Sequence, residues 1–157
     1  MTINLTVRAE VIDVRTDRPQ PSDTLFVDTN VWLWQTYGLP PKPDPQKASR
    51  KEQRQAQQAE QKLKIYTRYL NAALSRGVEL KYCGLILSEL AHVIEKTEFD
   101  GYDLFLLEAI RQTGIRPVQV LTDDMDYATV PNIQLFTGNG LVIRCADEQG
   151  KLISRRQ

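Results

Sequence analysis

The sequence predicts an α/β protein with a mainly parallel central sheet in a three-layer α/β/α arrangement. Short apolar runs, such as 24–27 and 118–121, alternate with longer helix-like segments. Strands that alternate with helices are joined by crossover connections, and these connections favour parallel pairing with helices on both faces. The length of 157 residues suits one domain with a single substantial core.

The first part of the chain predicts two strands and a short helix. Apolar and polar residues alternate as far as Val11, which predicts a half-exposed strand within an N-terminal extension, residues 1–23. The run Thr24–Val27 is typical of a buried central strand. A short helix is expected next, capped by Thr29 or Asn30.

A polar helical insertion is predicted over about residues 40–64, after a proline-rich loop. The helix is expected to continue past this insertion and to pack only through its second half, because apolar residues begin at Leu63. Gly77 is expected to end it.

The second half of the chain repeats the alternation of strand and helix. A strand is predicted from Glu79, and a terminal hairpin is expected from residues 141–143 and 152–153. The elements between them are two helices, at about 87–96 and 99–112, and two strands, at 118–121 and 133–136.

Composition points to a cytoplasmic protein with no membrane partner. Hydrophobic residues make up 41% and charged residues 25%, and no apolar run approaches the roughly 18 residues of a membrane span. Cys83 and Cys145 lie among strand-like residues and are interpreted as buried, reduced thiols. The formal net charge is zero. This argues against a pure binding module that contacts a long stretch of nucleic acid, because such proteins usually carry a basic excess.

Acidic residues follow three of the predicted strands. Asp28 comes directly after the first central strand, Glu89 and Asp103 fall early in the two helices after the second, and residues 123–126 follow the third. The carboxyl ends of parallel strands meet at one edge of a sheet, where ligands bind. We therefore expect a cluster of carboxylates at this edge.

Such a cluster is costly unless a cation lies among the carboxylates, because like charges repel and lose hydration. Mg²⁺ and Mn²⁺ prefer oxygen ligands, whereas zinc favours histidine and cysteine. A bound Mg²⁺ or Mn²⁺ polarises a phosphoryl oxygen and activates water, which predicts phosphodiester hydrolysis.

Each acid also has a structural explanation. Asp28 would cap a helix, Glu89 would be a solvated helix residue, Asp103 would complement the helix dipole, and the run 123–126 would form a turn. Their joint placement on an alternating α/β pattern favours the functional interpretation.

Four motifs together resemble the PIN-domain family of nucleases, and the similarity covers about residues 24–136. The motifs are, in order, Leu25–Asn30, Leu87–Leu90, Tyr102–Leu104 and Leu121–Tyr127. The resemblance implies a metal-dependent endoribonuclease that cleaves single-stranded RNA with Mg²⁺ or Mn²⁺. It also implies a toxin of a toxin–antitoxin pair, with an antitoxin-like protein partner and a homodimer.

Site residues follow from the resemblance position by position. Asp126 matches a further metal-binding acid, Asn30 matches a polar residue that supports the first Asp, and Thr122 matches the hydroxyl before the last acids. The family's catalytic and metal-binding acids correspond to Asp28, Glu89, Asp103 and Asp124.

Two alternatives stay open. A catalytically weak PIN-like module would bind RNA or protein, and an enzyme acting on double-stranded or structured nucleic acid would fit the same acids.

Arg155 is interpreted as part of a solvated tail. A set of basic residues at helical spacing is either a phosphate track or a solvated face: Lys47, Arg50, Lys51 and Arg54.

Overall fold

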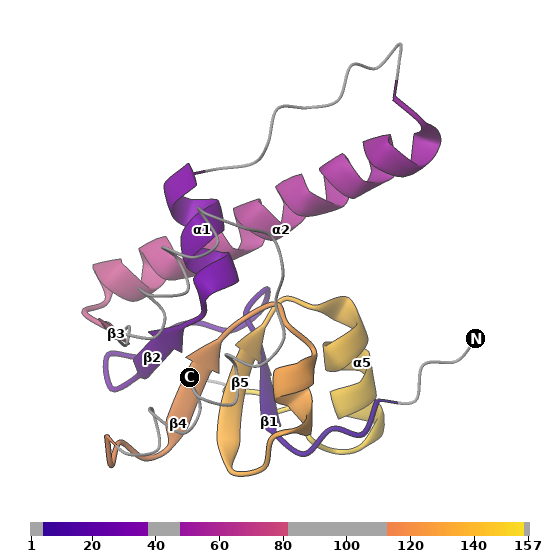
Figure 1. Ribbon diagram of the computed structural model, residues 1–157. Coiled ribbons are helices and arrows are strands. Elements are labelled where there is room, and N and C mark those ends of the chain that lie inside the picture. The colour runs from indigo at the N-terminus through magenta and orange to yellow at the C-terminus, as the bar shows by residue number, and fades with distance from the viewer. Residues whose placement is uncertain (1–4, 38–47, 82–112, 156–157) are drawn as a thin grey trace.

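The computed structural model describes residues 5–37, 48–81 and 113–155 (Figure 1). Several predicted features lie outside these residues. They are the helices at 87–96 and 99–112, Cys83, and the site residues Lys47, Glu89 and Asp103.

The described chain contains a five-stranded sheet in which every pairing is parallel, in the order β1-β5-β4-β2-β3. The strands are β1 (Glu10–Asp13), β2 (Thr24–Val27), β3 (Glu79–Lys81), β4 (Val118–Leu121) and β5 (Ile133–Thr137). Buried parallel strands need apolar residues on both faces, and all four residues of β4 are buried. The prediction of a mainly parallel α/β fold is confirmed.

The strand order places a topological switch at the centre of the sheet. From β2 the chain passes to β3 on one side of β2 and later to β4 on the other side. In open parallel sheets the ligand crevice lies beyond the carboxyl ends of the strands, at such a switch. The ends of β2 and β4 are therefore the part of the fold to inspect for a site.

Alternate residues of the strands belong to two separate apolar clusters. In β1, Val11 packs in a cluster with the C-terminal helix α5 (Gly140–Glu148), whereas Ile12 packs in a cluster with α1 (Thr29–Tyr37) and α2 (Arg50–Ser75). Figure 1 shows α5 beside β5 and β1, away from α2. The full three-layer arrangement stays a prediction, because two predicted helices lie outside the described residues.

Helix α2 has the character predicted for it. Its N-cap Ser49 and Glu52 form a reciprocal capping box, and its buried residues are confined to the second half: Tyr66, Tyr69, Leu70 and Ala73. The helix ends at Ser75, and Gly77 follows with a φ of 73°, a conformation that glycine adopts without steric cost.

The N-terminal strand differs from its prediction. It covers only Glu10–Asp13, and both Val11 and Ile12 are fully buried, so the strand is not half-exposed. Leu152 forms an isolated parallel bridge with Val11 on the outer side of β1. This extra backbone pairing and the two clusters cover the strand on both faces and along its edge.

The terminal hairpin prediction is wrong. Residues 140–148 form α5, which Asn139 caps by accepting hydrogen bonds from Leu141 N–H and Val142 N–H. Val142, Cys145 and Ala146 are buried along one side of this helix, and helical periodicity dominates over the β-branched character of Val142 and Ile143. Cys145 is a buried free thiol, as expected, but it lies on a helix.

Within the described residues, no helix combines the length and apolar character needed to cross a membrane.

Candidate active site

Asp28 lies at the carboxyl end of β2 and precedes α1. Its side chain is buried, with a relative exposure of 3%. Oδ1 accepts a 2.8 Å hydrogen bond from Thr29 N–H, and Oδ2 accepts a 2.7 Å hydrogen bond from the Thr122 hydroxyl. Its backbone carbonyl accepts from Val31 N–H and Trp32 N–H, which begins α1. Asp28 thus joins the start of a helix to a neighbouring strand, which is more than a local cap.

Thr122 connects the ends of β2 and β4. Besides donating to Asp28, its fully buried hydroxyl accepts a 2.9 Å hydrogen bond from Asp124 N–H. The Asp124 carboxylate in turn accepts from Asp126 N–H at 2.9 Å, and a short 3₁₀ helix, η1 (Asp126–Thr129), begins there. The structure therefore brings Asp28 and the Asp124 segment together through one hydroxyl.

The remaining predicted residues of this region are less buried. Asp124 is half-buried, whereas Asp126 and Asn30 are exposed. The hydroxyl of Thr122 supports Asp28 through a hydrogen bond, and a supporting role for Asn30 stays a prediction.

Carboxylate and hydroxyl oxygens are the donors that hard divalent cations prefer. Asp28, Asp124 and Asp126 supply such oxygens, so their chemistry fits Mg²⁺ or Mn²⁺. Across residues 5–37, 48–81 and 113–155, no group of three or more His, Cys, Asp or Glu side chains could hold a metal ion. The predicted site also includes Glu89 and Asp103, which lie outside those ranges.

Asp123 has a different role from Asp124. Its buried carboxylate forms an ion pair with Lys62 of α2 and accepts a 3.0 Å hydrogen bond from the Tyr66 hydroxyl. Its backbone carbonyl accepts from the Asn139 side chain at 2.9 Å. Asp123 therefore fixes the end of β4 against α2 and α5, and of this neighbouring pair Asp124 is the acid left for the site.

Tyr66 is a residue that sequence reasoning did not assign to this region. Its hydroxyl lies 3.0 Å from the carbonyl oxygen of Thr122 and accepts a 2.9 Å hydrogen bond from Gly138 N–H. Burial and the charge of Asp123 raise the pKa of this phenol. A Cβ at Gly138 would lie 3.0 Å from the Ile65 side chain, so glycine permits the close approach of α2. The sequence signal was a tyrosine within an apolar stripe, since a buried hydroxyl needs a partner.

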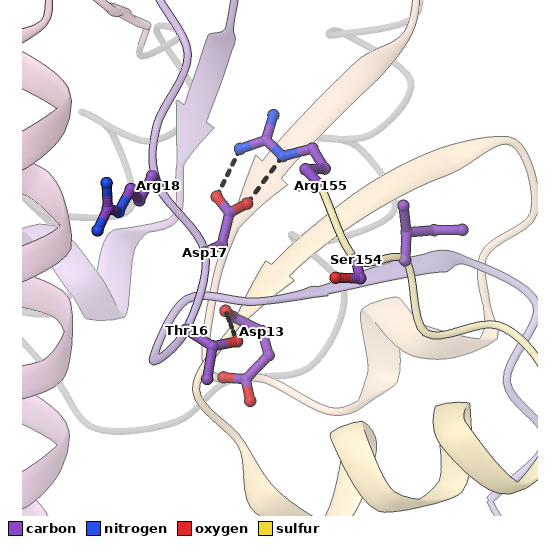
Figure 2. A pocket seen from close by; sticks show the side chains of 7 residues that line it. Asp13, Thr16, Asp17, Arg18, Ser154 and Arg155 are labelled. Carbon is purple, nitrogen blue, oxygen red and sulfur yellow. Dashed lines mark hydrogen bonds and ion pairs between the residues drawn. The ribbon is translucent and has the colours of Figure 1, made fainter. Parts of the chain in front are cut away.

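Arg155 is not part of a solvated tail. Its guanidinium forms ion pairs with Asp17 and Asp23 at 2.5 and 2.6 Å, and it lies 4.8 Å from the centre of the Phe136 ring. Figure 2 shows Arg155 and Asp17 beside a pocket. Its volume is about 390 Å³, and it is lined by residues from the end of β1 and the following loop, 13–18, and by the 153–155 segment. One arginine pairs with both acids, so these residues have the character of a structural ion-pair cluster.

Comparisons of the chain with protein-family models, with curated proteins and with solved structures found no match. The functional assignment therefore depends on the geometry of the site and on the sequence motifs.

Proposed function

We propose that this protein is a metal-dependent endoribonuclease of the PIN-domain type, which hydrolyses phosphodiester bonds of single-stranded RNA. The observation that carries the proposal is the connection of Asp28 to Asp124 through the Thr122 hydroxyl, at the switch between β2 and β4. Two acid-bearing strand ends at such a switch form the usual position for a ligand site in this class of sheet.

The chain's own residues have separate roles in this proposal. Asp28 and Asp124, together with Glu89, Asp103 and Asp126, would hold Mg²⁺ or Mn²⁺. When bound, such an ion supplies Lewis acidity at the phosphoryl oxygen and lowers the pKa of water. Thr122 orients Asp28 by donating to one carboxylate oxygen, which leaves the other lone pairs of the carboxylate as acceptors.

The biological setting is also a proposal. Composition supports a cytoplasmic location, and the PIN-domain resemblance supports a toxin with an antitoxin-like protein partner and a homodimeric state. These assignments rest on the motif set Leu25–Asn30 and Leu121–Tyr127 together.

Cleavage of a labelled single-stranded RNA tests the proposal. Purified protein would be assayed with Mg²⁺, with Mn²⁺ and with EDTA, beside the Asp28→Asn variant. We expect cutting with either metal, none with EDTA and none by the variant. Asp147→Asn is the matched control, because this exposed acid lies on α5, outside the proposed set.

Two outcomes would reject the assignment. Full activity of Asp28→Asn would remove Asp28 from the mechanism. Tight RNA binding without turnover, indifferent to divalent metal, would instead favour the catalytically weak binding module. Circular dichroism of each variant would show whether the fold is retained.

A further inference from the structure

The first part of α2 has an unusual position for a helix in a small domain. None of the residues from Arg50 to Ile65 is buried, and Figure 1 shows this part of the helix extending away from the sheet. Helices in small proteins obtain most of their stability from a packed apolar face. We name residues 50–61 the α2 arm. The arm contributes no buried side chain to the described core, so packing does not explain its presence.

Two of the arm's three basic residues, Lys51 and Arg54, lie on one side of the helix, and Lys62 continues this side beyond the arm. Lys51, Arg54, Gln58 and Lys62 follow the spacing i, i+3, i+7, i+11, which places them along a single face. The first three side chains are exposed, and 43% of the Lys62 side chain is accessible. We name these four residues the basic face.

The acids of the arm do not neutralise this face. Glu52 is engaged by the N-cap Ser49, which lowers the pKa of Glu52 through hydrogen bonds. Glu60 forms an i,i+4 ion pair with Lys64, 3.0 Å long, on another side of the helix. Lys51 also lies in the first turn, where the helix dipole disfavours a cation. Helix stability therefore gives no reason for this charge.

The basic face ends at the candidate active site. Lys62 forms an ion pair with Asp123, the residue before Asp124. With a rise of about 1.5 Å per residue, the face runs roughly 16 Å from Lys51 to Lys62. Lys51, Arg54 and Gln58 offer exposed donors for phosphate oxygens, and Lys62, which is paired with Asp123, joins this row to the acids after β4.

We propose that the basic face binds the sugar–phosphate backbone of the single-stranded RNA whose scissile phosphate lies at the site. This inference rests on the proposed function and adds to it the surface that holds the substrate. Phosphate is the occupant that the charge favours, and the glutamine between the cations supplies a neutral donor. In this proposal the carboxylates at the site cleave the RNA, and the cations on the arm bind it.

The test measures binding separately from cutting. A fluorescein-labelled single-stranded RNA of about 20 nucleotides, which exceeds the usual site size, would be titrated in EDTA and followed by fluorescence anisotropy. The variants are Lys51→Ala/Arg54→Ala on the basic face and Lys64→Glu as control. Both change the net charge by two units, but Lys64 lies on another side of the same helix.

We expect Lys51→Ala/Arg54→Ala to weaken binding about tenfold or more at low salt. The slope of log K against log salt should fall by about 1.4, since each single-strand phosphate contact contributes about 0.7. Lys64→Glu should change the slope by far less. Equal weakening by both variants would indicate a general charge effect and overturn the proposal.

Failure of this inference is distinguishable from failure of the proposed function. Metal-dependent cutting with unchanged RNA binding by Lys51→Ala/Arg54→Ala would overturn the basic face and keep the nuclease; a protein partner on this face would give that result. A selective loss of RNA binding without any cutting would support the basic face and reject the nuclease.

Discussion

The hydroxyl of Thr122 donates a 2.7 Å hydrogen bond to Oδ2 of Asp28 and so ties the end of β4 to the end of β2. Both residues are buried, so water does not compete freely for this contact. The same hydroxyl accepts from Asp124 N–H. One side chain therefore contacts two of the three described acids of the proposed site, Asp28 and Asp124, and its removal should affect both.

Thr122→Val keeps the shape of the side chain and removes the hydroxyl. We expect RNA cleavage to fall about 10- to 100-fold, the usual effect of losing a group that orients a metal ligand. The free energy of unfolding should fall by about 1–3 kcal/mol, because a buried carboxylate oxygen and an N–H lose a hydrogen-bond partner. Initial rates against metal concentration and denaturant unfolding measure the two effects.

Thr129→Val is the matched control for this variant, because the Thr129 hydroxyl donates only to the Asp126 carbonyl in η1. It should retain nearly full cleavage. Equal activity of the two valine variants would show that the hydroxyl of Thr122 does not position the site.

Two buried tyrosines of α2 allow a second comparison. Tyr66→Phe removes a hydroxyl that contacts Thr122, Asp123 and Gly138, whereas Tyr69→Phe removes one that donates to Asp17 at 2.6 Å. Both variants should lose about 1–3 kcal/mol of stability. Only Tyr66→Phe should lower kcat, because its contacts reach the segment that carries Asp124. Parallel losses of kcat in both variants would contradict a positioning role for Tyr66.

The same tyrosines predict instability at alkaline pH. Burial raises the pKa of both phenols above the ordinary value of 10, with the charges of Asp123 and Asp17 adding to the shift. The folded state then keeps protons that the unfolded chain loses above pH 10. Their contribution is complete below pH 10 and decreases above it, by about 1.4 kcal/mol per pH unit for each tyrosine.

Denaturant unfolding between pH 9 and 11 measures this dependence in the wild type and in Tyr66→Phe/Tyr69→Phe. The double variant should show a distinctly shallower decline, because its other titrating groups are unchanged. Identical slopes would mean that the tyrosines do not retain their protons in the folded state.

The sequence was sufficient to predict the central strands, because their signals are local. The runs Thr24–Val27 and Val118–Leu121 are short, apolar and bounded by polar residues, and both are strands in the structure. The C-terminal region was predicted wrongly because Leu141–Ile143 is equally compatible with a strand. The cap by Asn139 and the burial of Cys145 decide for a helix, and the second of these depends on tertiary packing.

The sequence motifs were sufficient to propose the acidic positions of the candidate site. The sequence placed Asp28 and Asp124 at strand ends, and the strand order brings those ends together. It did not reveal which acid of the pair 123–124 faces α2, because the Lys62 and Tyr66 contacts join residues about 60 positions apart. Contacts between residues so far apart produce no periodic pattern in a single sequence.

Arg155 gives the last prediction, since it was interpreted as a solvated residue and is a half-buried cation paired with two acids. Its side chain is 12% exposed and pairs with Asp17 and Asp23, which are 4% and 3% exposed. Arg155→Ala would leave two buried carboxylates without their cation, and we expect a loss of about 3–5 kcal/mol. Arg144→Ala, an exposed arginine of α5, should change stability by less than about 0.5 kcal/mol.

A triple variant separates the charge from the packing. Arg155→Met/Asp17→Asn/Asp23→Asn removes the cation and both negative charges, while the methionine still covers the Phe136 ring. Replacement of a whole buried ionic group by uncharged residues costs far less than removal of one partner. The triple variant should therefore be more stable than Arg155→Ala in denaturant unfolding. If Arg155→Ala were as stable as the wild type, the ion pairs would not hold the 13–18 loop to the 153–155 segment.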